Sequence, residues 1–384
     1  MANRSARVVS VVAAAALGLG AVAATATTAS AAAKLPAGCK SLTLAFFGAQ
    51  TGDAANLGIN ESNGAQLAVN QYNAKKPKVA VKLVKFDSQG DPAQAPALAQ
   101  KAIKDPCIVG IVGPAFSGES KAAGPIFERA QIPFMTASAT NPTLADNGWK
   151  FWHRGVGNDA MQAPKAALYI TKTLKATKVA VIDDASEYGK GLADLVVKAL
   201  GSKVVANESI DPKAQDFSST VSKIKSSGAT VVYYGGYYAE AGRLVKQMRD
   251  SNAKATLVSD DGVLDAGFVE AAGAANAAGT VVTCPCAPVK DVKGGAAFEK
   301  AYLAAFKQAS GTYSVETYDV TNFYLAAIKN NNFTRVAINK YISTKAFPGL
   351  SKTLKFNAKG ELANADIYGY VYQADGSTKG SIIK

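Results

Sequence analysis

Two hydroxyl side chains stand at positions where an α/β protein could bind an anion. Ser117 and Thr140 each follow a short apolar run that predicts a strand and precede a predicted helix or turn. There, hydroxyls and free backbone N–H groups can converge on a carboxylate, helped by the positive end of a helix dipole. Ser117 is equally well placed to be an ordinary helix N-cap. The two residues alone therefore leave an anion site and a structural cap both open.

Other reactive side chains are poorly arranged for catalysis. The acids Asp183-Asp184 and Asp260-Asp261 are adjacent, and neighbouring side chains of an extended segment point in opposite directions. His153 is the only histidine and lies in an aromatic segment, so we expect a structural role for it. After the first 33 residues there is no dinucleotide-binding glycine motif following a strand, no phosphate-binding loop and no G-x-S-x-G motif. We therefore predict a protein that is not an enzyme and uses no cofactor or metal.

The first 33 residues have the features of a signal peptide. Two arginines precede an alanine-rich apolar run over 8–24, and Ala-Ser-Ala at 29–31 suits cleavage. We expect residues 1–33 to be removed and the rest to be exported to the periplasm, the cell surface or the medium. A lipid anchor at Cys39 is not expected, because Pro36 stands where a lipoprotein box has a small or aliphatic residue.

The remaining chain is basic. Removing residues 1–33 takes two arginines and no acids from a net charge of +13, which leaves +11. The lysines are scattered singly or in pairs, and no basic cluster is interleaved with aromatic residues. We expect a solvated surface, with attraction to an acidic wall polymer or lipid surface as the alternative. We also expect a monomer with no nucleic-acid partner.

Four cysteines in an exported chain predict disulfides and allow three pairings. Cys39 precedes one predicted strand and Cys107 immediately precedes another. If these strands are parallel neighbours, both sulfurs lie at the same edge of the sheet, so we favour a Cys39–Cys107 bond. Cys284 and Cys286 would then close a tight loop, since the chain lacks the extra ligands and spacing of a zinc site.

From residue 40 onward, short β-branched runs alternate with amphipathic stretches of helical period. The predicted strands are 42–47, 79–86, 108–112, 133–135, 178–182, 204–210, 230–234 and 256–259. The predicted helices are 58–73, 93–104, 119–130, 160–174, 189–200, 217–226, 239–252, 296–308, 315–329 and 334–343. The βαβα order predicts parallel sheets with helices on both faces, in two series that separate around 149–159. An apolar segment at 279–284 indicates a second crossing between the two series, and the pattern ends in a predicted strand at 367–373.

Eight short segments follow one another in a recognisable order and spacing. They are GAQTG at 48–52, GAQLAVN at 64–70, DSQGDP at 87–92, VGPAFSG at 112–118, SATNP at 138–142, EYGKGLA at 187–193, VYYGGYY at 232–238 and DDGV at 260–263. Together they resemble the branched-chain amino-acid-binding family of type I periplasmic binding proteins. No single segment is specific, but the set stays in register from about residue 40 to 330.

The resemblance implies an α/β fold of two Rossmann-like lobes with parallel sheets, joined by a hinge of three crossings. Lobe 1 would comprise 38–156 and 284–357, and lobe 2 would comprise 157–283 and 358–384. A ligand that contacts both lobes only when they close would shift the protein to the closed state.

The resemblance also implies which residues bind the ligand. In lobe 1, Ser117 and Thr140 match positions that hold an α-carboxylate, and Ser138 and Ala139 would add close backbone contact. In lobe 2, Tyr188 and Tyr237 match positions that cover the ligand, and Asp261 matches the acid that receives the α-ammonium. An unpaired desolvated ammonium costs several kcal/mol, so such a site needs an acid there. The alternatives are an ordinary turn for Asp261 and aromatic core for the tyrosines.

Three positions depart from the family pattern where the ligand's side chain would lie. Leu57 and Val315 stand where an aromatic residue is common, and Ala115 stands where a larger apolar residue is common. These departures suggest room for a larger or differently shaped side chain than that of leucine, isoleucine or valine.

The function implied is capture of an amino acid, branched-chain or a related apolar or aromatic one, for the permease of an ABC importer. Two alternatives remain: a ligand such as an amide or aromatic acid, and a binding module that reports to a receptor instead of a transporter.

Overall fold

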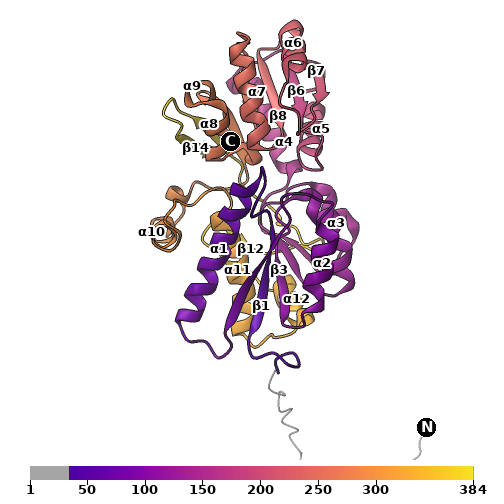
Figure 1. The fold of residues 1–384 in the computed structure, drawn as a ribbon, viewed down its shortest axis with the longest axis vertical. Helices are drawn as coiled ribbons and strands as arrows, with labels where there is room; N and C mark the ends of the chain where they lie inside the picture. Colours follow the sequence, from indigo (N-terminus) through magenta and orange to yellow (C-terminus); the bar gives the residue numbers. More distant parts are fainter. Residues whose placement is uncertain (1–33, 384) are drawn as a thin grey trace, which may run out of the picture. The chain divides into compact units, whose positions relative to one another are not determined.

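The computed structural model describes residues 34–383, in which two β-sheets are each covered by helices on both faces (Figure 1). The first sheet contains five parallel strands in the order β2-β1-β3-β4-β5. They are β1 (Leu42–Gly48), β2 (Val81–Asp87), β3 (Ile108–Val112), β4 (Phe134–Thr136) and β5 (Trp152–Arg154). Most of β1, β3 and β4 is apolar because strands covered on both faces meet no water.

Alternate residues of the first sheet pack against different helices. Phe47 points to the face covered by α2 (Ala95–Lys104) and α3 (Ser117–Arg129). Phe46 points to the opposite face, which is covered by α1 (Ala55–Ala74), α11 (Ser314–Lys329) and α12 (Arg335–Thr344). The helix α10 (Gly295–Phe306) packs beside α1 through Phe298 and Tyr302.

The second sheet has the order β14-β13-β10-β9-β8-β6-β7. Its strands are β6 (Val179–Asp183), β7 (Val204–Ser209), β8 (Val231–Gly235), β9 (Thr256–Ser259), β10 (Val281–Cys284), β13 (Tyr368–Tyr372) and β14 (Thr378–Ile382). The five strands from β6 to β10 run parallel, whereas β13 and β14 add an antiparallel edge.

Helices cover both faces of the second sheet as well. On one side are α4 (Asp159–Leu168), its single-turn π extension (Tyr169–Thr173) and α5 (Gly189–Leu200). On the other are α6 (Ser218–Ser227), α7 (Tyr238–Asp250), α8 (Ala266–Ala272) and α9 (Ala274–Ala277). Short 3-10 turns at 142–147, 201–203, 261–263 and 289–291 and a small hairpin of β11 (Phe347–Pro348) and β12 (Thr353–Leu354) complete the described chain.

The chain passes between the two sheets three times. It does so from β5 to α4, from β10 to α10, and from β12 to β13. The first and third passages are fastened together by the buried ion pair of Arg154 and Glu361, whose Nε–Oε2 distance is 3.1 Å. Arg154 also donates to the carbonyl oxygens of Ala139 and Asn141, so this buried guanidinium has partners for its charge and its N–H groups.

The predicted fold class is confirmed, and the differences lie at the edges of the sheets. We predicted that 149–159 is a break, but Trp152–Arg154 forms the edge strand β5 before the chain crosses. The strand β14 was not predicted, and β13 is antiparallel to its neighbour β10. His153 is buried in β5 and its Nε2 lies 2.9 Å from Asn339 Oδ1, which fits the structural role expected for it.

Both disulfides join the expected cysteines. Cys39 and Cys107 are bonded, and the strands that they precede, β1 and β3, are parallel neighbours as the argument required. Cys284 and Cys286 are bonded where β10 leaves the second sheet.

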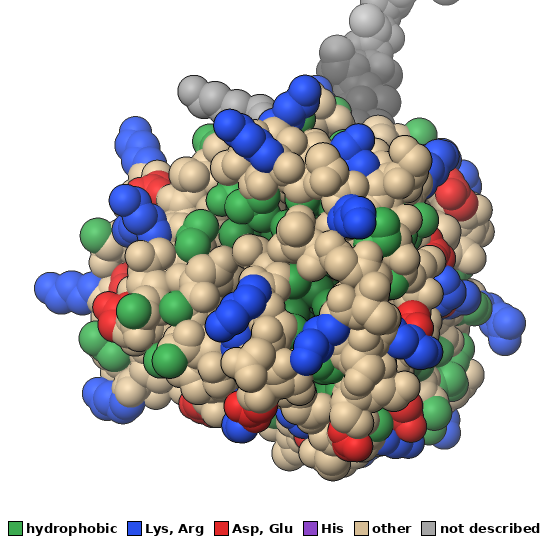
Figure 2. Space-filling model, turned by 90° about the horizontal axis from the view of Figure 1, so that it is seen from above, with side chains coloured by type: hydrophobic (Ala, Val, Ile, Leu, Met, Phe, Trp, Pro, Cys, Tyr) green, Lys and Arg blue, Asp and Glu red, His purple; other side chains and the backbone are tan. Residues whose placement is uncertain are grey.

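The lysines and arginines on the face shown in Figure 2 lie scattered among other side chains instead of forming one patch. None of the helices within 34–383 is long and apolar enough to span a membrane.

Candidate ligand-binding site

A small cavity lies where loops from the carboxyl ends of both sheets meet. In open α/β sheets this is the usual place for a ligand. Its lining consists of Leu57, Glu61, Ala115, Phe116, Ser117, Ser138, Tyr188, Tyr237, Asp261, Gly262 and Tyr313. The predicted residues Leu57, Ala115, Ser117, Ser138, Tyr188, Tyr237 and Asp261 are therefore brought together, whereas Ala139, Thr140 and Val315 do not line the cavity.

Ser117 is the first residue of the thirteen-residue helix α3, and Phe116 occupies the N-cap position. The structure thus does not use the Ser117 side chain as the N-cap. Its Oγ instead accepts the N–H of Asn141 at 3.2 Å, and it lies on the wall of the cavity. N–H groups in the first turn of a helix have no partner within the helix, so this wall favours an anion.

The segment 138–140 forms the adjacent part of the same wall. Ser138 donates its hydroxyl proton to the carbonyl oxygen of Ala115 at 2.6 Å, and Ala139 donates its N–H to Thr136 Oγ1 at 2.9 Å. Ala139 therefore supports the wall from behind. Thr140 is fully buried and lies near Asp159, but the contact lacks hydrogen-bond geometry and Thr140 Oγ1 has no partner within 34–383.

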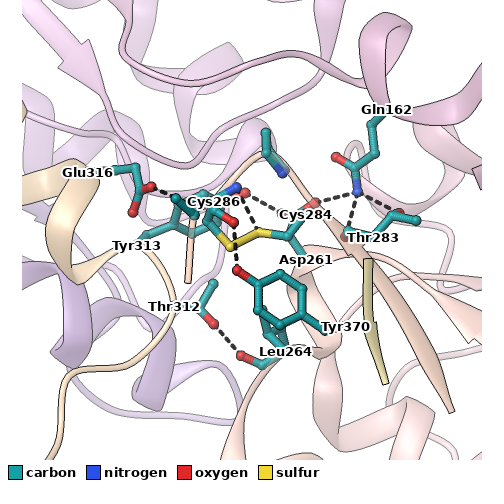
Figure 3. Close-up of a disulfide and its surroundings, with 12 residues drawn as sticks. Gln162, Asp261, Leu264, Thr283, Cys284, Cys286, Thr312, Tyr313, Glu316 and Tyr370 are labelled. Carbon is teal, nitrogen blue, oxygen red and sulfur yellow. Dashed lines mark hydrogen bonds between the residues drawn. A yellow bond between two sulfur atoms is a disulfide. The ribbon is translucent and has the colours of Figure 1, made fainter. Parts of the chain in front are cut away.

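The opposite wall is centred on Asp261, in the short turn after β9. Gln162 Nε2 donates to Asp261 Oδ1 at 2.8 Å, and the Tyr313 hydroxyl donates to Asp261 Oδ2 at 2.7 Å (Figure 3). Burial raises the pKa of Asp261, while the bonds from Tyr313 and Gln162 act in the opposite direction. Each carboxylate oxygen can accept a further bond, so Asp261 keeps capacity for a ligand.

Two more buried acids stand behind Asp261. Burial and the negative charge of Asp261 raise the pKa of Asp159 to about 8, and neither oxygen of Asp159 has a hydrogen-bond partner in the described chain. The same two causes raise the pKa of Asp260 well above its usual range. Unpaired acceptors in a buried acidic cluster favour a ligand that brings positive charge.

Two tyrosines close the cavity on the second-sheet side. The rings of Tyr188 and Tyr237 lie 5.4 Å apart, and Tyr237 meets Phe116 of the first-sheet side edge-on at 5.5 Å. The Tyr188 hydroxyl accepts the N–H of Gly262 at 3.3 Å. A Cβ on Gly262 would lie 2.3 Å from the carbonyl oxygen of Gly236 and 3.0 Å from the Tyr188 ring, so only glycine allows this approach.

Four residues of the lining were not predicted from the sequence: Glu61, Phe116, Gly262 and Tyr313. Tyr313 supplies an aromatic ring although Val315 departs from the aromatic residue that is common there, because Tyr313 stands just before α11 and faces Asp261. Val315 itself is in the first turn of α11 and packs with Leu67 and Tyr302. Gly262 and Phe116 lie next to predicted site residues, so proximity was a usable signal for them.

No group of three or more His, Cys, Asp or Glu side chains within 34–383 is arranged to hold a metal ion.

Comparison with known proteins identifies the family of the chain. The family model described as periplasmic binding protein matches residues 41–379. The leucine-specific-binding protein of Salmonella typhimurium is 32% identical over 343 residues, which cover 88% of this chain and 92% of the relative. The leucine-, isoleucine-, valine-, threonine- and alanine-binding protein of Pseudomonas aeruginosa is 30% identical and covers 87% of this chain and 91% of its own.

A solved structure is also similar. The branched-chain amino acid transporter substrate-binding protein LivJ of Streptococcus pneumoniae, in complex with isoleucine, has a TM-score of 0.84 and 26% identity. The match covers 90% of this chain and all of that one. The prediction that the chain is a binding protein and not an enzyme is thereby confirmed. The chain belongs to the type I periplasmic binding proteins, in the family of the branched-chain amino-acid-binding proteins.

Proposed function

We propose that this protein is exported and captures a free amino acid, branched-chain or related, for an ABC importer. The observation that carries the proposal is the pairing of two unlike walls across one cavity. Ser117 and the start of α3 face it from the first sheet, and the buried carboxylate of Asp261 faces it from the second. A zwitterion is the ligand that needs both walls at once.

The carboxylate end would be held without an arginine. The hydroxyl of Ser117 and the free N–H groups of the first turn of α3 are donors to an anion, and such charge-assisted bonds are about twice as strong as neutral ones. We place Ser138 beside them, because it lines the same wall, and we assign Thr140 no ligand contact, because it is fully buried and does not line the cavity.

The ammonium end would pair with Asp261. The N–H protons of a ligand ammonium can be shared among the free lone pairs of Asp261. Asp159 lies outside the cavity lining, so its buried oxygens add to the negative potential at this end without contacting the ligand. The tyrosines 188 and 237 would cover the ligand from the second-sheet side.

Closure of the two lobes would enclose the ligand between them. We divide the chain into 38–156 with 284–357 and 157–283 with 358–384, so that Ser117 and Asp261 belong to different lobes. The contacts between Phe116 and Tyr237 and between Lys121 and Glu187, whose Nζ–Oε2 distance is 2.9 Å, would then be made only when the lobes are closed. Residues 1–33, which carry the predicted signal peptide, lie outside the described residues.

Two relatives support the ligand class, since one is named as leucine-specific and another was solved with isoleucine. A structure from R. palustris in complex with benzoate is 19% identical to this chain, which supports the fold and not the ligand. Aromatic acids therefore enter the screen only as the result that would contradict the proposal.

The test is a thermal-shift screen of the purified protein against amino acids, their amides and aromatic acids, followed by calorimetry. A ligand at about 100 times its Kd stabilises the folded state by about 2.7 kcal/mol. We expect a shift from one or more free amino acids, a weaker shift from their amides, and loss of binding in Asp261→Asn. A shift from an aromatic acid and from no amino acid would contradict the proposal.

The transport role has its own test. Uptake of the labelled ligand by cells should be lost when the gene is deleted and restored by the intact protein. Unchanged uptake with retained binding in vitro would favour the receptor alternative.

A further inference from the structure

Glu61 is a buried acid in the wall of the binding cavity that the zwitterion-binding scheme does not use. It lies on α1 one turn after Leu57, and both side chains face the cavity because residues four apart share a helical face. Only 1% of Glu61 is exposed. It lines the cavity together with Leu57 and Ala115, the residues that we assign to the ligand's side chain.

The fold gives this carboxyl few partners. Thr317 Oγ1 donates to Glu61 Oε2 at 3.5 Å, which is the limit of a hydrogen bond. Ser138 lies close enough to lower the pKa of Glu61, but its hydroxyl proton is donated to the carbonyl oxygen of Ala115. No lysine or arginine pairs with Glu61 in the described chain.

Glu119 shows what a structural acid in the same lobe looks like. It is also fully buried, but one oxygen accepts the hydroxyl of Ser88 and the other accepts the N–H of Phe116 at 3.4 Å. Glu119 therefore holds the loop before α3 in place, and its burial is explained by the fold. Nothing comparable explains Glu61, and a buried polar group with unused capacity calls for a partner.

The charge state narrows the choice of partner. Burial, together with the negative charge of Glu119, raises the pKa of Glu61 well above its usual range. A protonated carboxyl still accepts through its carbonyl oxygen and can donate its own proton. A ligand hydroxyl can therefore bond to either form of Glu61, whereas a cationic side chain requires the ionised form, which burial disfavours.

We propose that Glu61 recognises the ligand's side chain and selects an amino acid with a hydroxyl on its Cβ over the apolar amino acid of the same shape. The hydroxyl of such a side chain bonds to Glu61, and its methyl group packs on Leu57 and Ala115. Threonine fits this description, and valine is its apolar isostere. The inference rests on the proposed function, since it assumes that an amino acid occupies the cavity.

The test measures Kd by calorimetry for threonine, allothreonine and valine with the wild-type protein and two variants. One net hydrogen bond is worth roughly 2- to 13-fold in affinity. We expect the wild type to bind threonine more tightly than valine by about that factor, and to bind allothreonine more weakly, because its methyl and hydroxyl groups exchange places. Glu61→Met, of similar length and without a polar carboxyl, should abolish or reverse the preference. Glu61→Gln keeps an acceptor and should retain part of it.

The ratio of the Kd values for threonine and valine is measured on the same protein. A general loss of stability weakens both ligands equally and leaves this ratio unchanged. An unchanged ratio in Glu61→Met, or a wild type that prefers valine, would overturn the role of Glu61. If Glu61→Met does not fold, the wild-type ratio and Glu61→Gln decide. Preference for 2,4-diaminobutyrate over threonine would show that Glu61 binds a cation instead. Failure of the wild type to bind any amino acid would refute the proposed function, which is a separate result.

Discussion

Tyr313→Phe is the sharpest test of the ammonium site because it removes one oxygen atom and no ring. The Tyr313 hydroxyl donates to Asp261 Oδ2 at 2.7 Å inside a fully buried cluster. Burial raises the pKa of Asp261, and the bond from Tyr313 is the first of the interactions that oppose this rise. Without this bond, the pKa of Asp261 rises further, so less of Asp261 is ionised at a given pH.

The size of the loss of affinity, and its dependence on pH, follow from this bond. A hydrogen bond to a charged group contributes about 1.5–3 kcal/mol, or roughly 10- to 150-fold in affinity, which is an upper limit on the loss. A ligand ammonium needs ionised Asp261, so affinity rises with pH through the pKa of Asp261 in the free protein. In the variant that rise moves to higher pH. The loss should therefore be greatest at low pH and shrink as the pH increases.

Calorimetry with the ligand from the screen, in steps from pH 5.5 to 8.5, measures this difference. The matched control is Tyr318→Phe, which removes a hydroxyl that donates to Gln71 Oε1 at 2.7 Å and does not line the cavity. We expect the control to follow the wild type at every pH. A Tyr313→Phe profile that also coincides with the wild type, or that is weakened equally at every pH, would refute the pairing of the ammonium with Asp261.

Three further expectations concern single features. Ser117→Ala should weaken ligand binding roughly 10- to 150-fold, the value of one hydrogen bond to a charged group, and unchanged affinity in calorimetry would remove its hydroxyl from the carboxylate site. Asp159 has a raised pKa of about 8, so its contribution to stability is present below about pH 4 and is lost as pH rises towards 8. Urea unfolding of the ligand-free protein should accordingly show a smaller loss of stability between pH 5 and pH 8 in Asp159→Asn than in the wild type, and equal losses would count against this. Replacing Cys39 and Cys107 by serine opens a loop of 68 residues and should cost about 4 kcal/mol in urea unfolding, whereas a cost near zero would contradict the chain-entropy argument.

The parts of the fold that were predictable depend on local pattern. Parallel strands such as β1 and β3 are continuous apolar runs, and their adjacency was enough to pair Cys39 with Cys107. The short edge strand β5 escaped prediction because it ends in a buried arginine. Arg154 is tolerated there only because Glu361, 207 residues later, supplies its counter-charge. A contact of that range leaves no trace in local periodicity.

Glu61 and Tyr313 also escaped prediction because contacts between distant segments of the chain decide that they face the cavity. Glu61 lies in a twenty-residue helix with many polar side chains, where an acid is an ordinary surface residue until α11 packs against it. Tyr313 differs from the predicted Val315 by two positions, and only the start of α11 at Ser314 decides which of the two faces the cavity. Both errors concern packing between α1 and α11, which are distant in sequence.

Gln162 links the ammonium site to the passages between the sheets. It stands at the start of α4, just after the first passage, and its Nε2 shares its protons between Asp261 Oδ1 and both oxygens of Thr283 (Figure 3). Thr283 is followed at once by the Cys284–Cys286 loop, and Cys286 is held by the Tyr370 hydroxyl on its carbonyl oxygen at 2.7 Å. The acid that we assign to the ligand is thus fastened to the first and second passages together. A ligand can shift closure only by the difference between its affinities for the open and closed states. Asp261 is fixed to these passages, so its distance from the α3 wall depends on their conformation. A zwitterion that bonds to both walls therefore has a higher affinity for the closed state than for the open state.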